Sequence, residues 1–366
     1  MRLTKHMYSN GSTLKNISIF ILKMAILGFS FLLPNIAWAN CYNVGASGRL
    51  ANYCALNTLR DTKVSLRSLQ YIDQKLKVEG SIKGLGFPAR VKSNSISKYI
   101  YPILSYSSNI NGGNSSDPLV LGNNTFEGDE ALFLKEGAIA GLGAGLNGRY
   151  IYSNQRYLSY SVNSSYTQSP EYGMGISSTN ANSCSVNFIK NHWYIDLCAN
   201  TSLTQKEITE STSNNISLVS SKLYSSDKGT YNEASFGFSR HFSETYAQNQ
   251  ALIGYKTIHS NNAYSAINFT LGESVENKLA MQYAISGKIT SQFVQKPLKL
   301  SISYSKFDGG KLLGFDRNQR KMDLSISYPV WKNLNVTLGY SNSDSNIDYY
   351  DISTPTFGIQ FKPFKF

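Results

Sequence analysis

The sequence has few charged side chains and no long apolar run. Charged residues make up 16% of the 366 residues, whereas soluble proteins carry about a quarter. The longest apolar stretch, Met24 to Leu33, is too short for a membrane-spanning helix. Low charge without an apolar helix is typical of a wall that meets lipid on one face and water on the other.

The sequence also lacks recognisable catalytic, metal-binding and nucleic-acid-binding motifs. After residue 39 the histidines are His192, His241 and His259, and none lies in a metalloprotease or hydrolase motif. His241 shares the polar face of its segment with Glu233, so the two could form a catalytic dyad. A solvated histidine at the lumen or rim is the simpler interpretation. The Lys and Arg residues are dispersed, which argues against a nucleic-acid partner. We therefore expect no enzyme activity, metal or cofactor.

Residues 1–39 are predicted to be a secretory signal peptide. A basic beginning precedes the apolar stretch, and Ala37-Trp38-Ala39 supplies a small-residue cleavage site. Asn40 stands where lipidation of Cys41 would require a small residue, so we expect no lipid anchor. Removal of the four basic residues of this segment leaves 31 basic and 23 acidic residues, a net charge of about +8. The mature chain is therefore basic and exported.

Four cysteines form two closely spaced pairs, which an exported protein can oxidise to disulfides. Cys41 and Cys54 would join a small loop to a short helix around residues 50–59.

The second pair, Cys184 and Cys198, is harder to place on one strand face. Cys184 alternates in step with the apolar Val186 and Phe188, whereas Cys198 falls on the polar face of the next segment. We expect a bulge or a three-residue turn to bring the two together.

Beyond residue 98 the sequence alternates between apolar and polar residues, which is the pattern of β-strands with two different faces. The clearest example is Leu298, Leu300, Ile302 and Tyr304, each separated by Lys or Ser. We predict fourteen strands at residues 99–110, 137–152, 155–168, 174–188, 193–204, 214–224, 231–243, 248–258, 262–272, 278–290, 297–307, 320–330, 334–343 and 354–366. An even number of segments of about ten residues predicts an all-β, antiparallel up-and-down transmembrane barrel in the outer membrane.

The connections differ in length on the two sides of this barrel. Those after even-numbered strands are mostly short, whereas those after odd-numbered strands include 111–136, 205–213, 308–319 and 344–353. Short periplasmic turns and long extracellular loops are the rule for such barrels, whereas a soluble β-sandwich has no reason to sort its loops. We therefore expect both termini on the periplasmic side.

Residues 40–98 show apolar patches without a sustained period, which predicts an irregular periplasmic segment. It could line or partly plug the barrel lumen, or it could dock a partner, and the residues do not select between these alternatives.

The chain ends in an aromatic strand of the kind that barrel assembly machinery reads. We assign this assembly signal to Phe357, Gly358, Phe361, Phe364 and Phe366. Pro363 cannot donate a ladder hydrogen bond, so we expect it at or just past the last lipid-embedded pair.

Residues 99–366 resemble the C-terminal barrel of the surface lipoprotein assembly modifiers. The resemblance rests on the barrel's opening segment, Tyr106-Ser107-Ser108-Asn109-Ile110-Asn111, and on the Phe-rich last strand. It implies help in moving lipoproteins across the outer membrane. Larger members of that family add a helical repeat domain, which residues 40–98 are too short to supply.

These observations leave two functions open. The first is transport or translocation across the outer membrane, including surface export of a protein or lipoprotein. The alternative is a non-conducting surface barrel whose extracellular loops bind a ligand or partner. A basic barrel would favour anions in its lumen or bind lipopolysaccharide phosphates outside. Expected partners are thus outer-membrane lipid, lipopolysaccharide, the assembly machinery and an exported protein.

Overall fold

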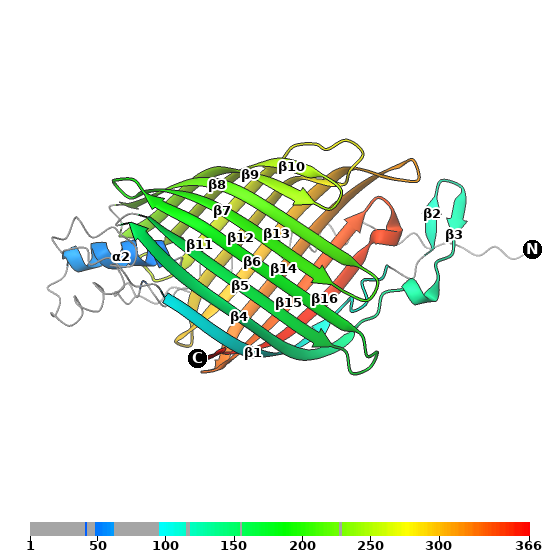
Figure 1. Ribbon diagram of the computed structural model, residues 1–366, viewed down its shortest axis with the longest axis horizontal. Helices are drawn as coiled ribbons and strands as arrows, with labels where there is room; N and C mark the ends of the chain where they lie inside the picture. The colour runs from blue at the N-terminus through cyan, green and yellow to red at the C-terminus, as the bar shows by residue number, and fades with distance from the viewer. Residues whose placement is uncertain (1–40, 42–47, 62–94, 115–117, 154–155, 227–228) are drawn as a thin grey trace, which may run out of the picture. The chain divides into compact units, whose positions relative to one another are not determined.

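The computed structural model describes residues 41, 48–61, 95–114, 118–153, 156–226 and 229–366. The predicted signal peptide, residues 1–39, and most of the predicted periplasmic segment lie outside them. Within the described residues, fourteen long strands pair antiparallel in chain order, and the last pairs with the first (Figure 1). Such closure leaves no sheet edge unpaired, which is the condition for a sheet to span a bilayer.

The predicted count of fourteen strands is confirmed, and every strand end lies within five residues of its predicted position. The barrel strands are β1 (Ser95–Ser107), β4 (Gly137–Ser153), β5 (Arg156–Gln168), β6 (Gly175–Phe188), β7 (Trp193–Gln205), β8 (Glu210–Ser226), β9 (Thr230–Ser243), β10 (Ala247–Ile258), β11 (Tyr264–Gly272), β12 (Ala280–Phe293), β13 (Lys296–Leu312), β14 (Phe315–Trp331), β15 (Leu334–Ser345) and β16 (Ile352–Phe361). The short elements are α2 (Gly48–Asp61), β2 (Leu119–Leu121), β3 (Asn124–Phe126), η2 (Glu130–Leu132), η3 (Asp348–Tyr350) and β17 (Phe364–Lys365).

The alternation of side chains gives the wall two chemically different faces. On β8, Ile216 and Leu218 are each 51% exposed on the outer face, whereas Ser217 and Ser221 are buried on the lumen face. Exposed apolar side chains continue round the outer face at Ile100, Leu142, Val162, Leu197, Phe238, Ile253, Ile267, Ile285, Ile302, Ile326, Leu338 and Phe357. A continuous apolar belt of this size requires lipid around it, so the chain is an integral outer-membrane barrel.

The two open ends of the barrel differ, and we name them by their connections. The short-turn mouth holds the starts of β5, β7, β9, β11, β13 and β15, together with the start of β1 and β17. The long-loop mouth holds the described connecting residues 108–114, 118–136, 169–174, 206–209, 244–246, 273–279, 313–314 and 346–351. In Figure 1, α2 lies at the short-turn mouth and the β2–β3 hairpin lies beyond the long-loop mouth.

The predicted loop at 308–319 is wrong. β13 continues to Leu312 and β14 begins at Phe315, with Leu313 and Gly314 at φ 50° and 89° in the turn between them. Two successive residues with positive φ match the tight turns that join paired strands. The hydrophobic alternation ends where the lipid ends, but backbone pairing continues beyond it. The sequence pattern therefore marked the edge of the apolar belt and not the end of the strands.

The glycine-rich part of β4 lies under two aromatic rings of β1. A Cβ at Gly145 would lie 2.5 Å from Tyr99 Cζ, and a Cβ at Gly143 would overlap the Tyr101 ring. The Tyr101 hydroxyl then donates to Asn163 Oδ1 at 3.0 Å on β5. The glycines thus let two tyrosines lie flat against the lumen wall.

The barrel closes through β16 and the short β17. Four residues of β1, Ile103 to Tyr106, pair with Gln360 to Phe357. After an interruption at Pro363, Phe364 pairs with Ile100 and the next residue pairs with Tyr99. Pairing therefore resumes beyond Pro363, where we had expected the lipid-embedded strand to end.

Candidate functional site: the lumen and its plug

At the short-turn mouth the helix α2, which a disulfide joins to Cys41, packs against the lumen side of the wall. We call α2 and Cys41 the plug. Tyr53 and Cys54 lie three and four residues after Leu50, so both are on the same helix face as Leu50. Leu50 and Cys54 are fully buried, and Tyr53 is 8% exposed. The helix thus presents an apolar face, although its neighbours belong to the lumen of a barrel.

The wall meets this face with an apolar patch, which we call the socket. Its residues lie on the lumen face of six neighbouring strands: Val186, Tyr194, Leu223, Tyr231, Ile258 and Tyr264. Each is at most 7% exposed. Lumen-facing positions are ordinarily polar. Apolar residues at lumen-facing positions of a strand are therefore the sequence signal for a bound plug. The prediction that residues 40–98 could plug the lumen did not use this signal.

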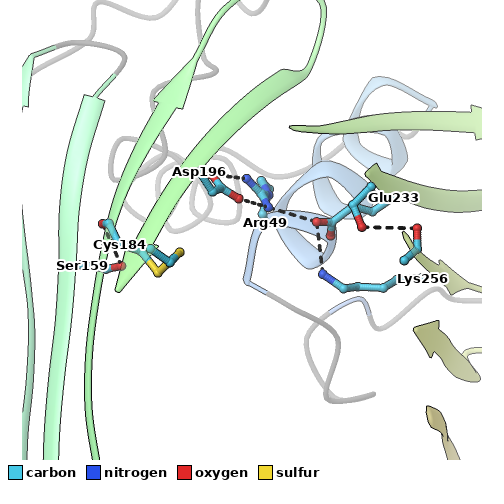
Figure 2. Close-up of polar contacts among 9 residues, drawn as sticks. Arg49, Ser159, Cys184, Asp196, Glu233 and Lys256 are labelled. Carbon is cyan, nitrogen blue, oxygen red and sulfur yellow. Dashed lines mark hydrogen bonds and ion pairs between the residues drawn. A yellow bond between two sulfur atoms is a disulfide. The ribbon is translucent and has the colours of Figure 1, made fainter. Parts of the chain in front are cut away.

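Figure 2 shows a charged cluster beside the socket, which we call the ion network. Arg49 of the plug bonds Asp196 on β7 at 2.9 Å and Glu233 on β9 at 3.0 Å. Lys256 on β10 approaches Glu233 at 3.2 Å. The Arg49 guanidinium also lies 4.4 Å from the centre of the Tyr194 ring. One plug side chain therefore contacts two charges and one aromatic ring of the wall.

The ion network is largely shielded from water. The side chain of Glu233 is 1% exposed, and those of Arg49 and Asp196 are 15% and 14% exposed. Burial alone would lower the pKa of the Arg49 guanidinium, but Glu233 and Asp196 outweigh it and hold that pKa above its ordinary value. Arg49 is therefore permanently charged, and its removal would leave buried carboxylates short of a cation.

Both cysteine pairs are disulfide-bonded, as Cys41–Cys54 and Cys184–Cys198. Cys184 lies directly opposite Cys198. Ile189 N donates to the Trp193 carbonyl at 2.9 Å, which leaves Lys190, Asn191 and His192 between the two strands, so the expected three-residue turn is confirmed. Val186 had been assigned to the apolar, lipid-facing set. It faces the socket, so Cys184 and Cys198 both point into the lumen.

Beyond the plug the lumen is polar. Amide and hydroxyl side chains occupy the inward positions by register: Asn163, Asn180, Asn200, Asn215, Asn268, Ser286, Ser303, Ser325 and Thr337. Asp323 accepts hydrogen bonds from Ser303 at 3.1 Å and from Ser341 at 2.6 Å. This lining offers hydrogen bonds to water and to hydrophilic solutes along the inner wall.

The lumen presents little of the chemistry that an enzyme needs. His241 and Glu233 are eight residues apart on β9, roughly 26 Å along a strand. Glu233 belongs to the ion network, so the two do not form a dyad. In the part of the chain that the structure describes, no three His, Cys, Asp or Glu residues gather in a way that could hold a metal ion.

The segment that carries the family resemblance closes part of the long-loop mouth. Ile110 is fully buried and Asn111 is 1% exposed. The Asn111 carbonyl accepts from Ile208 N at 3.0 Å, and Lys206 Nζ donates to the Asn109 carbonyl at 2.7 Å. Burial lowers the pKa of Lys206. The first loop, between β1 and β4, is thus fastened to the loop between β7 and β8, and β7 is three strands beyond β4 in the sheet order.

The residues of the predicted assembly signal lie along the closing seam. Phe357 and Gly358 pair with β1, Phe361 ends β16, and Phe364 begins β17. Phe364 and Phe366 are 69% and 73% exposed. Their role in assembly stays a prediction.

No protein-family model and no curated protein matches the sequence. Similar solved structures include OccAB4 of Acinetobacter baumannii, at 8% identity over 76% of this chain and 100% of that one, with a TM-score of 0.39. OprB of Pseudomonas putida covers 75% and 94% of the two chains at 7% identity and a TM-score of 0.43. The outer membrane protein opdK of Pseudomonas aeruginosa covers 75% and 99% at 6% identity and a TM-score of 0.41. Scores this low carry no functional argument, and the resemblance to the surface lipoprotein assembly modifiers stays a prediction.

Proposed function

We propose that the chain is an outer-membrane transport barrel whose lumen is closed by the plug and opens when the plug leaves its socket. The observation that carries this proposal is the way the plug is held. Arg49 and the apolar face of α2 contact the wall through side chains, and α2 adds no strand to the barrel sheet. The plug can therefore move while the backbone ladder of the barrel stays intact.

The polar lumen supports a path for hydrophilic solutes. A barrel of more than eight strands encloses more space than its own inward side chains fill. Here the inward side chains away from the socket are mainly Ser, Thr and Asn, which are short and well hydrated.

The proposal is tested by planar-bilayer conductance of the purified full-length chain with Arg49→Ala. The variant leaves Asp196 and Glu233 with one cation fewer and removes the contact with Tyr194. Breaking a fully buried ion pair costs about 3–5 kcal/mol, and less is expected here because 15% of the Arg49 side chain is exposed. We expect the open probability to rise at least tenfold. Lys321→Ala, which breaks an ion pair within the wall, should leave it unchanged.

A second pair of variants guards against misfolding of Arg49→Ala. Cys41→Ser/Cys54→Ser releases the staple of the plug, and Cys184→Ser/Cys198→Ser removes a bond of nearly equal sequence separation from the wall. Each loop closure is worth on the order of 3 kcal/mol to folding in the chain-entropy model. The first variant should increase channel opening and the second should not. If Arg49→Ala and Cys41→Ser/Cys54→Ser both fold correctly and neither shows increased channel opening, the gated channel is refuted.

One observation favours the alternative of a non-conducting surface barrel. The β2–β3 hairpin and its neighbour η2 expose Val120, Phe126 and Leu132 by 54%, 46% and 46%. Exposed apolar residues on a loop beyond the membrane are typical of a partner-binding surface.

Export of a protein or lipoprotein is a more specific version of the transport proposal. It requires complete removal of the plug, since a polypeptide is wider than a small solute.

A further inference from the structure

Two lysines lie side by side on the lumen face of β12 and β13. Lys288 is directly opposite Ser301, and Lys299 is directly opposite Thr290. The lysines are therefore diagonal neighbours on one face, with Cβ atoms roughly 7–8 Å apart. Two long, flexible side chains at this separation can place both ammonium groups on a single anion.

Neither lysine has its charge neutralised by the wall. Among the described residues, no carboxylate lies within 4.0 Å of Lys288 or Lys299. The nearest strands in register with them contribute Ala266, Ser325 and Ser327. The two lumen carboxylates on either side are engaged elsewhere: Glu233 with Arg49 and Lys256, and Asp323 with two serines and Lys321. Adjacent like charges repel each other, and a bound anion would remove that repulsion.

An unpaired hydroxyl adjoins the two lysines. Thr290 is 0% exposed, and its Oγ1 has no hydrogen-bond partner among the described residues. Buried hydroxyls are nearly always hydrogen-bonded, so a buried one without a partner needs an explanation. Thr290 lies opposite Lys299 on the same face, and its hydroxyl can donate to an oxygen held by the ammonium groups once the side chains that cover it turn aside.

We propose that Lys288, Lys299 and Thr290 form an oxyanion-binding site in the lumen, which takes the phosphate, sulfate or carboxylate group of an anionic solute. This inference rests on the proposed transport function and names its substrate class. The site is also close to the plug. Lys288, Ala266 and Lys256 are successive partners across three strands, and Lys256 contacts Glu233 of the ion network. An anion at the site would therefore be next to the closure that it has to pass.

The test is calorimetric titration of the detergent-solubilised full-length chain with inorganic phosphate at low ionic strength, where screening is weak. We expect saturable binding that Lys288→Ala/Lys299→Ala weakens at least tenfold and Thr290→Val weakens severalfold. Lys306→Ala/Lys321→Ala removes the same total charge from two lysines that already have carboxylate partners, and it should bind phosphate as the wild type does. Equal affinity in the two double variants, or no binding by the wild type, would overturn the site. Parallel titrations with sulfate and acetate assign the oxyanion class.

Failure of this site and failure of the transport function give different results. Reversal potentials of Arg49→Ala channels in a KCl gradient should show anion preference, which the Lys288→Ala/Lys299→Ala change abolishes. Conductance without anion preference or phosphate binding would reject the site and keep the transport function. Phosphate binding by a chain that never conducts would keep the site and reject the transport function.

Discussion

The face of the wall to which a single side chain points decides whether it contacts lipid or the water of the lumen. Neighbouring residues of one strand lie in lipid and in the lumen, although they are a few ångströms apart. On β14, Leu324 pairs with the outward Ile302, whereas Ser325 pairs with the lumen-facing Ser301. One substitution made at both positions therefore separates the effect of lipid from that of the substitution itself.

We expect Leu324→Arg to lower the free energy of unfolding in lipid vesicles by about 2–4 kcal/mol if its position is near the bilayer midplane. Ser325→Arg should be tolerated, because its guanidinium reaches the polar lumen. Urea titration of vesicle-inserted protein measures both values. Similar losses at the two positions would mean that the outer face is not in lipid.

The sequence could not indicate which distant residues some side chains contact. Val186 and Cys184 were assigned by parity to the apolar, lipid-facing set, but they face the plug. Arg49 and Glu233 are 184 residues apart, and no spacing rule connects a charge on a short helix with one on a distant strand. Contacts of this kind depend on which segment enters the lumen, and that is a property of the folded barrel.

At the scale of elements, the strands were largely predictable because a two-residue period is visible in any run that separates lipid from water. Their ends were less so. β13 and β14 outlast the apolar belt, and β17 resumes pairing after Pro363. The helix was expected around residues 50–59 and occupies Gly48–Asp61. The contact of this helix with the socket was not predicted. The sequence left open whether residues 40–98 line or plug the lumen or dock a partner.

The last element supplies the next prediction. β17 adds two pairs to β1, and Phe366 N donates to the Lys98 carbonyl at 3.2 Å. Deletion of residues 364–366 should prevent closure and leave unfolded chain in the periplasm. Phe364→Ala/Phe366→Ala keeps the backbone pairing and removes the aromatic signal. Heat-modifiable, protease-resistant barrel in the outer membrane is measured for each variant. Normal amounts of barrel from the deletion would show that the terminus has no role in assembly.

At the scale of the whole molecule, a segment outside the barrel strands lies at each end of the polar lumen. The plug contacts the wall at the short-turn mouth, and the first loop crosses part of the long-loop mouth through Asn111 and Ile208. In the proposed transport function, a solute therefore meets the plug at one end and the first loop at the other. The orientation of the barrel decides which closure a solute meets first, and it follows from the connection lengths and the chain ends.

We predict that the long-loop mouth is extracellular and that the plug is on the periplasmic side. Asn123 lies in the exposed turn between β2 and β3, and Asn333 lies in the exposed turn between β14 and β15. All four native cysteines are disulfide-bonded, so Asn123→Cys and Asn333→Cys each add a single free thiol. A maleimide on a polymer too large to cross the outer membrane should label Asn123→Cys in intact cells. It should label Asn333→Cys only after the outer membrane has been permeabilised. The reverse pattern would place the plug at the cell surface, where it would face incoming solutes directly.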